Sequence, residues 1–300
     1  MLARLLDSGA RCVAVDLAPA GTRLRQLIPA ERLAEVEVVA GDIVEDGLVE
    51  RVVREHAVSR IIHLAALQIP LVASAPARGA EVNVVGTVRV FEAAAAARDQ
   101  VNGLAYASSA AVFGETGALE PATLYGVFKI ANEETARIFA QTHRLSSIGL
   151  RPWAVFGPGR DHGLTAAPTH ALRAVALGER YRIPFGGRLD LQYARDVADA
   201  FIAASLAAGA GAFVANLRGS VVSIDEFIQI VDKIRPGAAD LLTHDTDAIP
   251  IAAEPGGAAV DELLGETPRT PLTTAVRETL EHFDAQVRIG ELRAGEIVRE

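Results

Sequence analysis

The sequence predicts an α/β fold built on a doubly wound parallel sheet, followed by a smaller C-terminal lobe. Across residues 1–150, short runs rich in β-branched residues alternate with longer segments whose apolar positions follow a helical period. This alternation indicates a parallel sheet with helices on both faces. The strand segments are also continuously apolar, as expected for strands that are buried on both sides.

The predicted elements follow one another in a regular order. We expect strands at 12–16, 36–40, 60–64, 103–108 and 147–150, with helices at 47–56, 79–98 and 124–144. After residue 151 the chain changes character, with glycine- and proline-rich loops at 157–163 and 184–187. A helix at 196–208, a strand at 213–217 and helices at 224–234 and 272–283 follow. We expect the loops of this second half to close over the carboxyl edge of the sheet.

Composition excludes several classes of protein. The chain has 300 residues and a formal net charge of -9 without basic runs, which argues against nucleic-acid binding. Its apolar runs are shorter than the ~20 residues of a membrane span, and no signal-peptide layout is visible, so we expect a soluble cytoplasmic protein. The seven histidines are scattered and Cys12 is the one cysteine, which predicts no metal site and no internal disulfide.

The sharpest chemical signal is the pair Tyr125 and Lys129 in the segment LYGVFK. Residues four apart at the start of a predicted helix lie one turn apart on the same side. A phenol has a reference pKa of about 10, and an adjacent ammonium lowers that pKa towards the range that a general base needs. The alternative is a surface tyrosine beside an unrelated lysine, but both residue types are rare in this sequence.

Two serines, Ser108 and Ser109, follow the apolar run GLAYA shortly before Tyr125. A hydroxyl at the carboxyl end of a parallel strand can direct a hydrogen-bond donor at a substrate oxygen. The sequence therefore places a candidate donor beside the candidate base.

These segments resemble the extended short-chain dehydrogenases, also called the NAD-dependent epimerase/dehydratase family. The resemblance lies in YASSAAVFG followed by YGVFK, and in HLAA at 63–66, NVVGT at 83–87, RPWAVFGPG at 151–159 and LLGETP near the C-terminus. It implies a Rossmann-like fold, with a dinucleotide-binding domain at 1–151 and a mainly substrate-binding lobe at 152–300, between which the chain crosses more than once. It also implies Ser109, Tyr125 and Lys129 as catalytic residues.

The cofactor expected from this resemblance is NAD. Asp16 ends the first predicted strand, where a carboxylate binds both ribose hydroxyls and repels a 2′-phosphate, so NAD is favoured over NADP. The resemblance implies that Asp42 contacts the adenine, although a helix N-cap is the alternative for this residue. The full set of expected cofactor-binding residues is Asp16, Asp42, Ile43, Leu64, Ala65, Ala66, Asn83, Tyr125, Lys129 and Pro152.

The sequence departs from the family at positions that bear on the reaction. Ala110 and Ala111 stand where sugar-nucleotide dehydratases of the family carry an acidic pair, so we do not expect dehydration. Ala154 and Leu189 stand where sugar-nucleotide epimerases of the family carry an asparagine and a phosphate-binding arginine. Candidate substrate-binding residues are Arg160, His162, Arg188 and Gln192, because arginines suit a carboxylate or phosphate. The alternative for these four is a solvated loop surface.

We therefore expect an NAD-dependent oxidoreductase that acts on a secondary alcohol of a sugar or sugar-like acid. A nucleotide-sugar 4-epimerase is the alternative within the same class, and a catalytically inactive Rossmann-like protein is the alternative from another class. The alanine-rich helices at 79–98 and 124–144 are apolar on more than one face. In the family that the chain resembles, these helices pair across a two-fold axis, so we expect a homodimer.

The last expectation concerns the N-terminus. The family that the chain resembles has a strand and a glycine-rich turn before the helix with which this sequence opens. Either a later start codon has been assigned or the form is truncated, and in both cases no pyrophosphate-binding glycine can be named. We expect this form to bind NAD more weakly than one extended by the ~10–20 residues of a strand and turn. Calorimetric titration of both forms checks this, and equal affinities would refute it.

Overall fold

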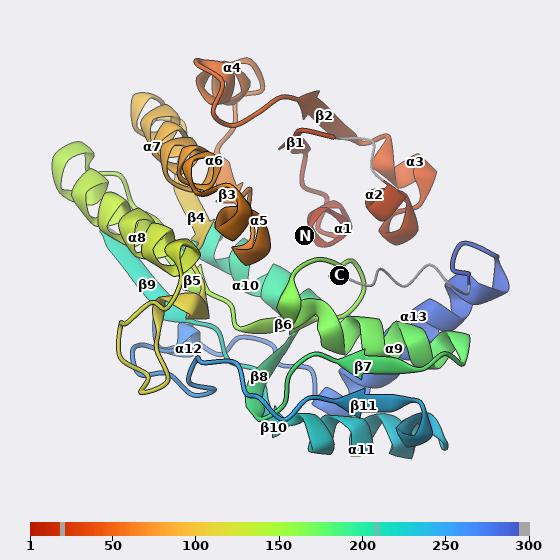
Figure 1. The fold of residues 1–300 in the computed structure, drawn as a ribbon. Coiled ribbons are helices and arrows are strands. Elements are labelled where there is room, and N and C mark those ends of the chain that lie inside the picture. Colours follow the sequence, from red (N-terminus) through yellow and green to blue (C-terminus); the bar gives the residue numbers. More distant parts are fainter. Residues whose placement is uncertain (19–21, 208, 210, 294–300) are drawn as a thin grey trace.

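The computed structural model describes residues 1–18, 22–207, 209 and 211–293 (Figure 1). Four parallel strands form the larger sheet in the order β3-β4-β5-β9. Their bounds are Arg60–His63, Gly103–Ala107, Ser147–Arg151 and Ala212–Asn216. Strands β1 (Cys12–Asp16) and β2 (Val36–Ala40) form a separate parallel pair. The parallel sheet is thus present in two pieces, and in the described part of the chain no strand pairs with both β1 and β3.

Helices cover both faces of the larger sheet, as expected for a Rossmann-like fold (Figure 1). Helices α4 (Leu48–Glu55), α7 (Gly86–Ala96) and α8 (Leu124–His143) lie on one face, and α10 (Ala194–Leu206) lies on the other. Successive residues of β4 divide between these layers, because Leu104 and Tyr106 pack with α7 and α8 whereas Ala105 packs with α10. This alternation within a continuously apolar strand explains why both of its faces are buried.

The second half of the chain builds a lobe of its own and also returns to the first sheet through β9. Its strands are β6 (Ala154–Phe156), β7 (Tyr181–Ile183), β8 (Arg188–Tyr193), β10 (Ser220–Ser223) and β11 (Leu242–His244), in the sheets β10-β8-β6 and β11-β7. Its longer helices are α9 (Ala167–Leu177), α11 (Ile224–Ile234) and α13 (Leu272–Arg288). These helices pack on a core that includes Trp153, Phe156, Phe185, Phe227 and Phe283.

Short elements connect these layers. They are α1 (Leu2–Asp7), α2 (Thr22–Leu27), α3 (Ala30–Leu33), α5 (Ile69–Ser74), α6 (Pro76–Ala80), α12 (Val260–Leu264), a π-helix η1 (Glu81–Val85) and the 3₁₀ turns η2 (Ala110–Val112), η3 (Leu164–Ala166) and η4 (Ala238–Asp240). Among the described residues, no helix combines the length and apolarity that a membrane span requires.

Most predicted elements of the first half are confirmed within one or two residues, and the strands at 12–16 and 36–40 have the predicted bounds. The single helix predicted at 79–98 was wrong in form, because the chain passes through α6 and the π-helix η1 before α7 begins at Gly86. In the second half, β6, β7, β8, β10, β11 and α9 were not predicted. The helix predicted at 196–208 runs from Ala194 to Leu206, and residue 208 lies outside the described residues.

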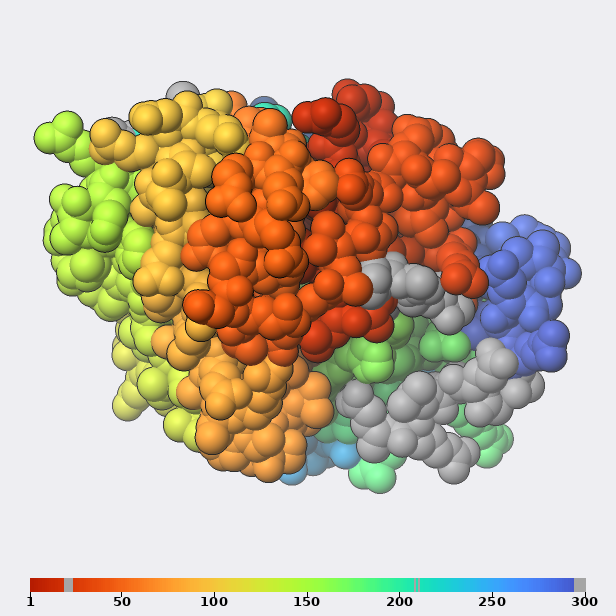
Figure 2. Space-filling view, turned by 90° about the horizontal axis from the view of Figure 1, so that it is seen from above, coloured from red at the N-terminus to blue at the C-terminus, as the bar shows by residue number. Residues whose placement is uncertain are grey.

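Helix α8 begins close to the end of β4 because of its first turn. The Thr123 side chain accepts a hydrogen bond from the Gly126 amide at 3.1 Å and so caps the helix. A Cβ atom at Gly126 would lie 2.2 Å from the Ala111 carbonyl oxygen, so only glycine lets the helix approach the chain that follows Ser109 this closely. In the space-filling view, α8 forms one outer side of the molecule and α13 lies at the opposite side (Figure 2).

Candidate active site

Strand β4 and helix α8 bring the predicted catalytic residues together. Ser109 follows the end of β4, and Tyr125 lies in the first turn of α8. Lys129 is 3% exposed, and its Nζ donates a hydrogen bond to the carbonyl of Ala107, the last residue of β4, at 2.7 Å. The same Nζ lies 5.3 Å from the centroid of the Tyr125 ring. The predicted one-turn separation on a helix is therefore present, and the lysine also anchors the helix to the strand.

The charge beside the Tyr125 hydroxyl differs from the sequence-based expectation. Burial raises the pKa of the Tyr125 phenol, while a hydrogen bond with Ser109 and the positive charge of Arg160 lower it. The expected cation was Lys129, but its ammonium is directed at the Ala107 carbonyl. The cation that favours the Tyr125 phenolate is therefore Arg160 rather than Lys129.

Burial also sets the protonation of the groups around Lys129. It lowers the pKa of Lys129 to about 8, against the opposing effect of the Glu133 carboxylate. His63, at the end of β3, has its pKa lowered to about 3 by burial and by the charge of Lys129. Its Nε2 lies 3.0 Å from Thr87 Oγ1, so His63 is a neutral, hydrogen-bonded core residue.

A buried carboxylate joins the same elements one turn further along α8. Glu133 accepts two hydrogen bonds from Arg151, at 2.7 Å from Nε to Oε1 and 2.6 Å from Nη2 to Oε2. The hydroxyl of Ser108 donates to Oε1 of the same carboxylate. Arg151 Nη1 also lies 3.5 Å from Asn216 Oδ1, at the end of β9. Sequence reasoning missed Glu133 and Arg151, although Glu133 repeats the spacing of four that links Tyr125 and Lys129.

The residues expected to bind the adenosine part of NAD lie at the carboxyl ends of β1 and β2. Asp16 is exposed, and its Oδ1 accepts a hydrogen bond from the Ala18 amide at 2.9 Å. Asp42 is not a helix N-cap, because Gly47 holds that position in α4. Its carboxylate instead forms an ion pair with Arg78 and accepts a hydrogen bond from the Val44 amide.

Ile43 and Asn83 shape the surroundings of the expected cofactor rather than expose their side chains to it. Ile43 is 9% exposed and packs so closely on Gly86 that a Cβ there would lie 2.5 Å from its Cδ1. Asn83, in the π-helix, is buried, and its amide exchanges hydrogen bonds of 2.7 and 2.8 Å with the backbone of Leu67. Asn83 thereby holds the loop that follows β3.

That loop has the character of a cofactor surface. It contains Leu64, Ala65 and Ala66; Leu64 is 44% exposed, and Ile69, at the start of α5, is 38% exposed. Exposed apolar side chains at the carboxyl edge of a parallel sheet suit the flat rings of a dinucleotide. Half-buried Pro152, directly after β5, borders the same edge. With the Asp16 carboxylate, these residues fit NAD.

The four predicted substrate-binding residues do not converge. Arg160 is near enough for its charge to act on the Tyr125 phenol, and its guanidinium donates to Gln68 and, at 3.1 Å, to Thr165. His162 follows in the same loop with a side chain that is 61% exposed. Arg188 instead lies 3.5 Å from Glu226 of α11.

Gln192 is buried, and all of its amide atoms are used. Its Oε1 accepts from the Trp153 amide at 3.0 Å, and its Nε2 donates to Asp190 at 2.8 Å. Both Arg188 and Gln192 therefore hold the second lobe together, and neither is brought to Tyr125.

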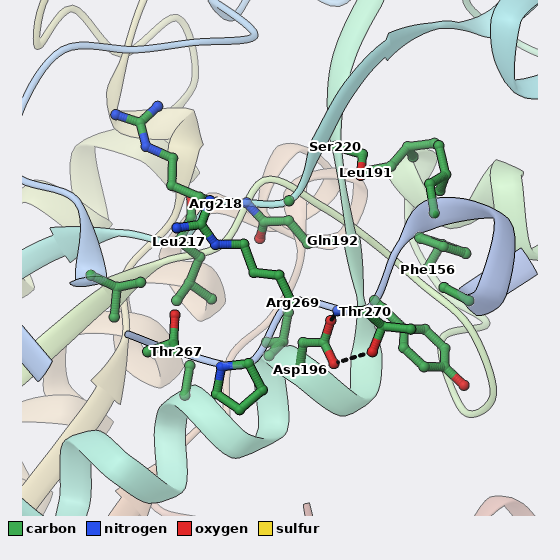
Figure 3. A pocket seen from close by; sticks show the side chains of 18 residues that line it. Phe156, Leu191, Gln192, Asp196, Leu217, Arg218, Ser220, Thr267, Arg269 and Thr270 are labelled. Carbon is green, nitrogen blue, oxygen red and sulfur yellow. Dashed lines mark hydrogen bonds between the residues drawn. The ribbon is translucent and has the colours of Figure 1, made fainter. Parts of the chain in front are cut away.

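A pocket lies at the start of α10, and none of the catalytic candidates is among the residues that line it (Figure 3). Asp196 accepts hydrogen bonds there from the Thr270 amide and hydroxyl, at 2.6 and 2.8 Å. Of the predicted site residues, Gln192 alone lines it. Within the described ranges, no group of three or more His, Cys, Asp or Glu side chains could hold a metal ion.

Comparisons with known proteins identify the family of the chain. Residues 1–214 match the model of the NAD dependent epimerase/dehydratase family. A UDP-glucose 4-epimerase of Azospirillum brasilense is 28% identical, over 78% of this chain and 73% of its own. A UDP-glucose 4-epimerase of Mycolicibacterium smegmatis is 32% identical, over 69% of each chain.

A solved structure of MoeE5 in complex with UDP-glucose and NAD is 25% identical. It superposes with a TM-score of 0.76, over 95% of this chain and 94% of its own. From the family match and this shared architecture, we conclude that the chain belongs to the NAD-dependent epimerase/dehydratase family and is an enzyme with NAD as its cofactor.

Proposed function

We propose that this enzyme carries out NAD-linked hydride transfer at a secondary alcohol of a sugar or sugar-like acid, with Ser109, Tyr125 and Lys129 as its catalytic residues. The observation that carries the proposal is the meeting of these residues where β4 ends and α8 begins. A base, a hydroxyl donor and a buried cation at the carboxyl edge of a parallel sheet are the parts that alcohol oxidation needs.

Each residue has one task in the proposed reaction. Ser109 donates a hydrogen bond to the reacting oxygen and holds it beside the Tyr125 hydroxyl. Tyr125, as phenolate, accepts the proton of the substrate hydroxyl. Arg160 supplies the positive charge that favours the phenolate. Lys129, whose ammonium lies 5.3 Å from the centroid of the Tyr125 ring, holds the cofactor together with Asp16 and the loop after β3. NAD, when bound, provides the acceptor for the hydride that leaves the carbinol carbon.

The second candidate is 4-epimerisation of a nucleotide sugar, which is favoured by the similarity to the two UDP-glucose 4-epimerases. Against it, Ala154 and Leu189 are 0% and 1% exposed and belong to the apolar core of the second lobe. The side chains at these positions offer no polar atom to a diphosphate. Incubation with NAD and UDP-glucose, UDP-glucuronate or a set of aldonic acids separates the candidates, because a dehydrogenase accumulates NADH and an epimerase does not.

Three further expectations, on domains, location and assembly, belong to the same proposal. The division at residues 151 and 152 into a cofactor domain and a mainly substrate-binding lobe is one, and a cytoplasmic location is another. The third is a homodimer formed by α7 and α8. On α8, Leu124, Val127 and Ile138 share one side and are 48%, 46% and 44% exposed, and α8 forms an outer side of the molecule (Figure 2).

The first prediction tests the base. Tyr125→Phe should lower turnover by about 10²–10⁴-fold, because the proton acceptor is lost while the ring remains. Steady-state kinetics with the substrate that supports turnover measure the effect. Tyr181→Phe, in β7 of the second lobe, is the matched control and should leave turnover unchanged. Near-normal turnover of the Tyr125 variant would contradict the assignment of Tyr125 as the general base.

The second prediction tests the choice of cofactor. NAD should bind more tightly than NADP, because the Asp16 carboxylate at the end of β1 repels a 2′-phosphate. Asp16→Ala should narrow or reverse the ratio of the two dissociation constants, measured by calorimetry. Asp99→Ala, at a fully exposed carboxylate, should leave the ratio unchanged. A preference of the unmodified protein for NADP would contradict the proposal.

The third prediction tests the dimer. Sedimentation at micromolar concentration should show a dimer, and Ile138→Glu should shift it towards monomer because a charge would lie in the apolar contact. Ile289→Glu, which follows α13 and is 69% exposed, is the control and should remain dimeric. A monomer in the unmodified protein rules out the pairing.

A further inference from the structure

We propose that Glu133 is the positioning residue of this active site: its buried carboxylate joins α8 to the ends of β4 and β5, and its charge acts on the buried ammonium of Lys129 one turn earlier. This inference rests on the proposed catalytic roles of Ser109, Tyr125 and Lys129 and adds the group that holds them together. The hydrogen bonds of Glu133 go to Ser108 and Arg151 rather than to the two reacting side chains, Ser109 and Tyr125, so its effect is indirect.

The first argument is the pattern of attachments between helix and strand. Lys129 Nζ binds the carbonyl of Ala107, and one turn later Glu133 binds the hydroxyl of Ser108. Two residues spaced by four on α8 thus hold two consecutive residues at the end of β4. Ser109 directly follows these two residues, so the two contacts restrict its position relative to Tyr125.

The second argument is the reach of the same carboxylate. Arg151 is the last residue of β5 and binds both oxygens of Glu133. Both side chains are buried, at 9% exposed for Glu133 and 11% for Arg151. A two-point contact between a guanidinium and a carboxylate defines orientation as well as distance. Arg151 also lies 3.5 Å from Asn216, and through it the contact extends to the end of β9.

The third argument is electrostatic. Lys129 is almost fully buried, and burial favours its neutral form. The charged or titratable groups that face it are Tyr125 and Glu133 on its own helix, His63 on β3 and, through Glu133, Arg151 on β5. His63 is neutral, so Glu133 is the carboxylate among them that favours the ammonium, which the proposed mechanism requires.

The simpler explanation is that Glu133 and Arg151 form a structural ion pair without effect on the site. The two explanations differ in what happens to Lys129. A structural pair changes the melting temperature alone, whereas a carboxylate whose charge acts on Lys129 also changes the protonation of that lysine. The sequence makes this measurable, because Lys129 and Lys233 are its lysines.

The decisive experiment is an NMR titration of protein labelled with ¹³C-lysine, with Lys233→Arg used to assign the two signals. In the unmodified protein the pKa of Lys129 should be about 8. Glu133→Gln, which keeps the shape of the side chain, should lower this pKa by about one unit. Glu134→Gln is the matched control, because the neighbouring carboxylate is 60% exposed and pairs with Arg137. It should leave the pKa of Lys129 unchanged.

A second variant covers the possibility that Glu133→Gln does not fold, since it leaves the Arg151 charge buried without a partner. The double variant Glu133→Gln with Arg151→Gln removes both charges, and it should still show a lowered pKa for Lys129. An unchanged pKa of Lys129 in whichever variant folds overturns the proposal. Because this titration needs neither NAD nor substrate, its outcome is independent of the proposed function.

The positioning role has its own measurement. Ser108→Ala removes one hydrogen bond to Glu133 and leaves the ion pair with Arg151 intact. It should lower kcat by about 5–10-fold with the substrate that supports turnover, with little change in KM or in the pKa of Lys129, as loss of one hydrogen bond near a reacting group predicts. If Ser108→Ala keeps a normal kcat while Tyr125→Phe abolishes turnover, the assignment of the catalytic residues is supported and the positioning role of Glu133 is contradicted.

Discussion

The close approach of helix α8 to the carboxyl ends of β4 and β5 is the constraint on which the rest of the site depends. Gly126 makes that approach possible, because any side chain there would meet the Ala111 carbonyl. The approach in turn buries Lys129 and Glu133, and buried charges are stable only when they are paired or hydrogen-bonded. Each of them is satisfied by a group at a strand end, so the contacts that remove the cost of burial also align helix and strand.

Sequence analysis predicted the parts of this arrangement that are local in the chain. Tyr125 and Lys129 lie one turn apart on one helix, and Asp16 ends a strand of five residues, so short-range periodicity is sufficient to place them. Arg151 and Glu133 come from separate elements, and Gln68 and Arg160 are further apart still. Contacts of that kind depend on how the elements pack against one another, and the periodicity of apolar residues within one element does not predict them.

The missed elements have a related cause. Strands β6, β7 and β11 have three residues each, which is too short for an alternating pattern to be visible. The π-helix at Glu81–Val85 was hidden for another reason, because its residues continue the apolar pattern of α7. Its extra residue in the turn places Asn83 where both of its amide atoms reach Leu67, so the irregularity serves the loop after β3.

The second lobe shows where substrate selection can reside. Ala154, Leu189 and Gln192 are buried and contribute to the interior of that lobe, so strands β6 and β8 support the site without facing it. The loop after β6 is different, because Arg160 is held by Gln68 and Thr165 and acts on the Tyr125 phenol. A guanidinium at this place both favours the phenolate and attracts a negatively charged group next to the reacting hydroxyl. Under the proposed function, the charge that assists the base would also be the charge that attracts an acidic substrate, which would link substrate preference to catalysis in this chain.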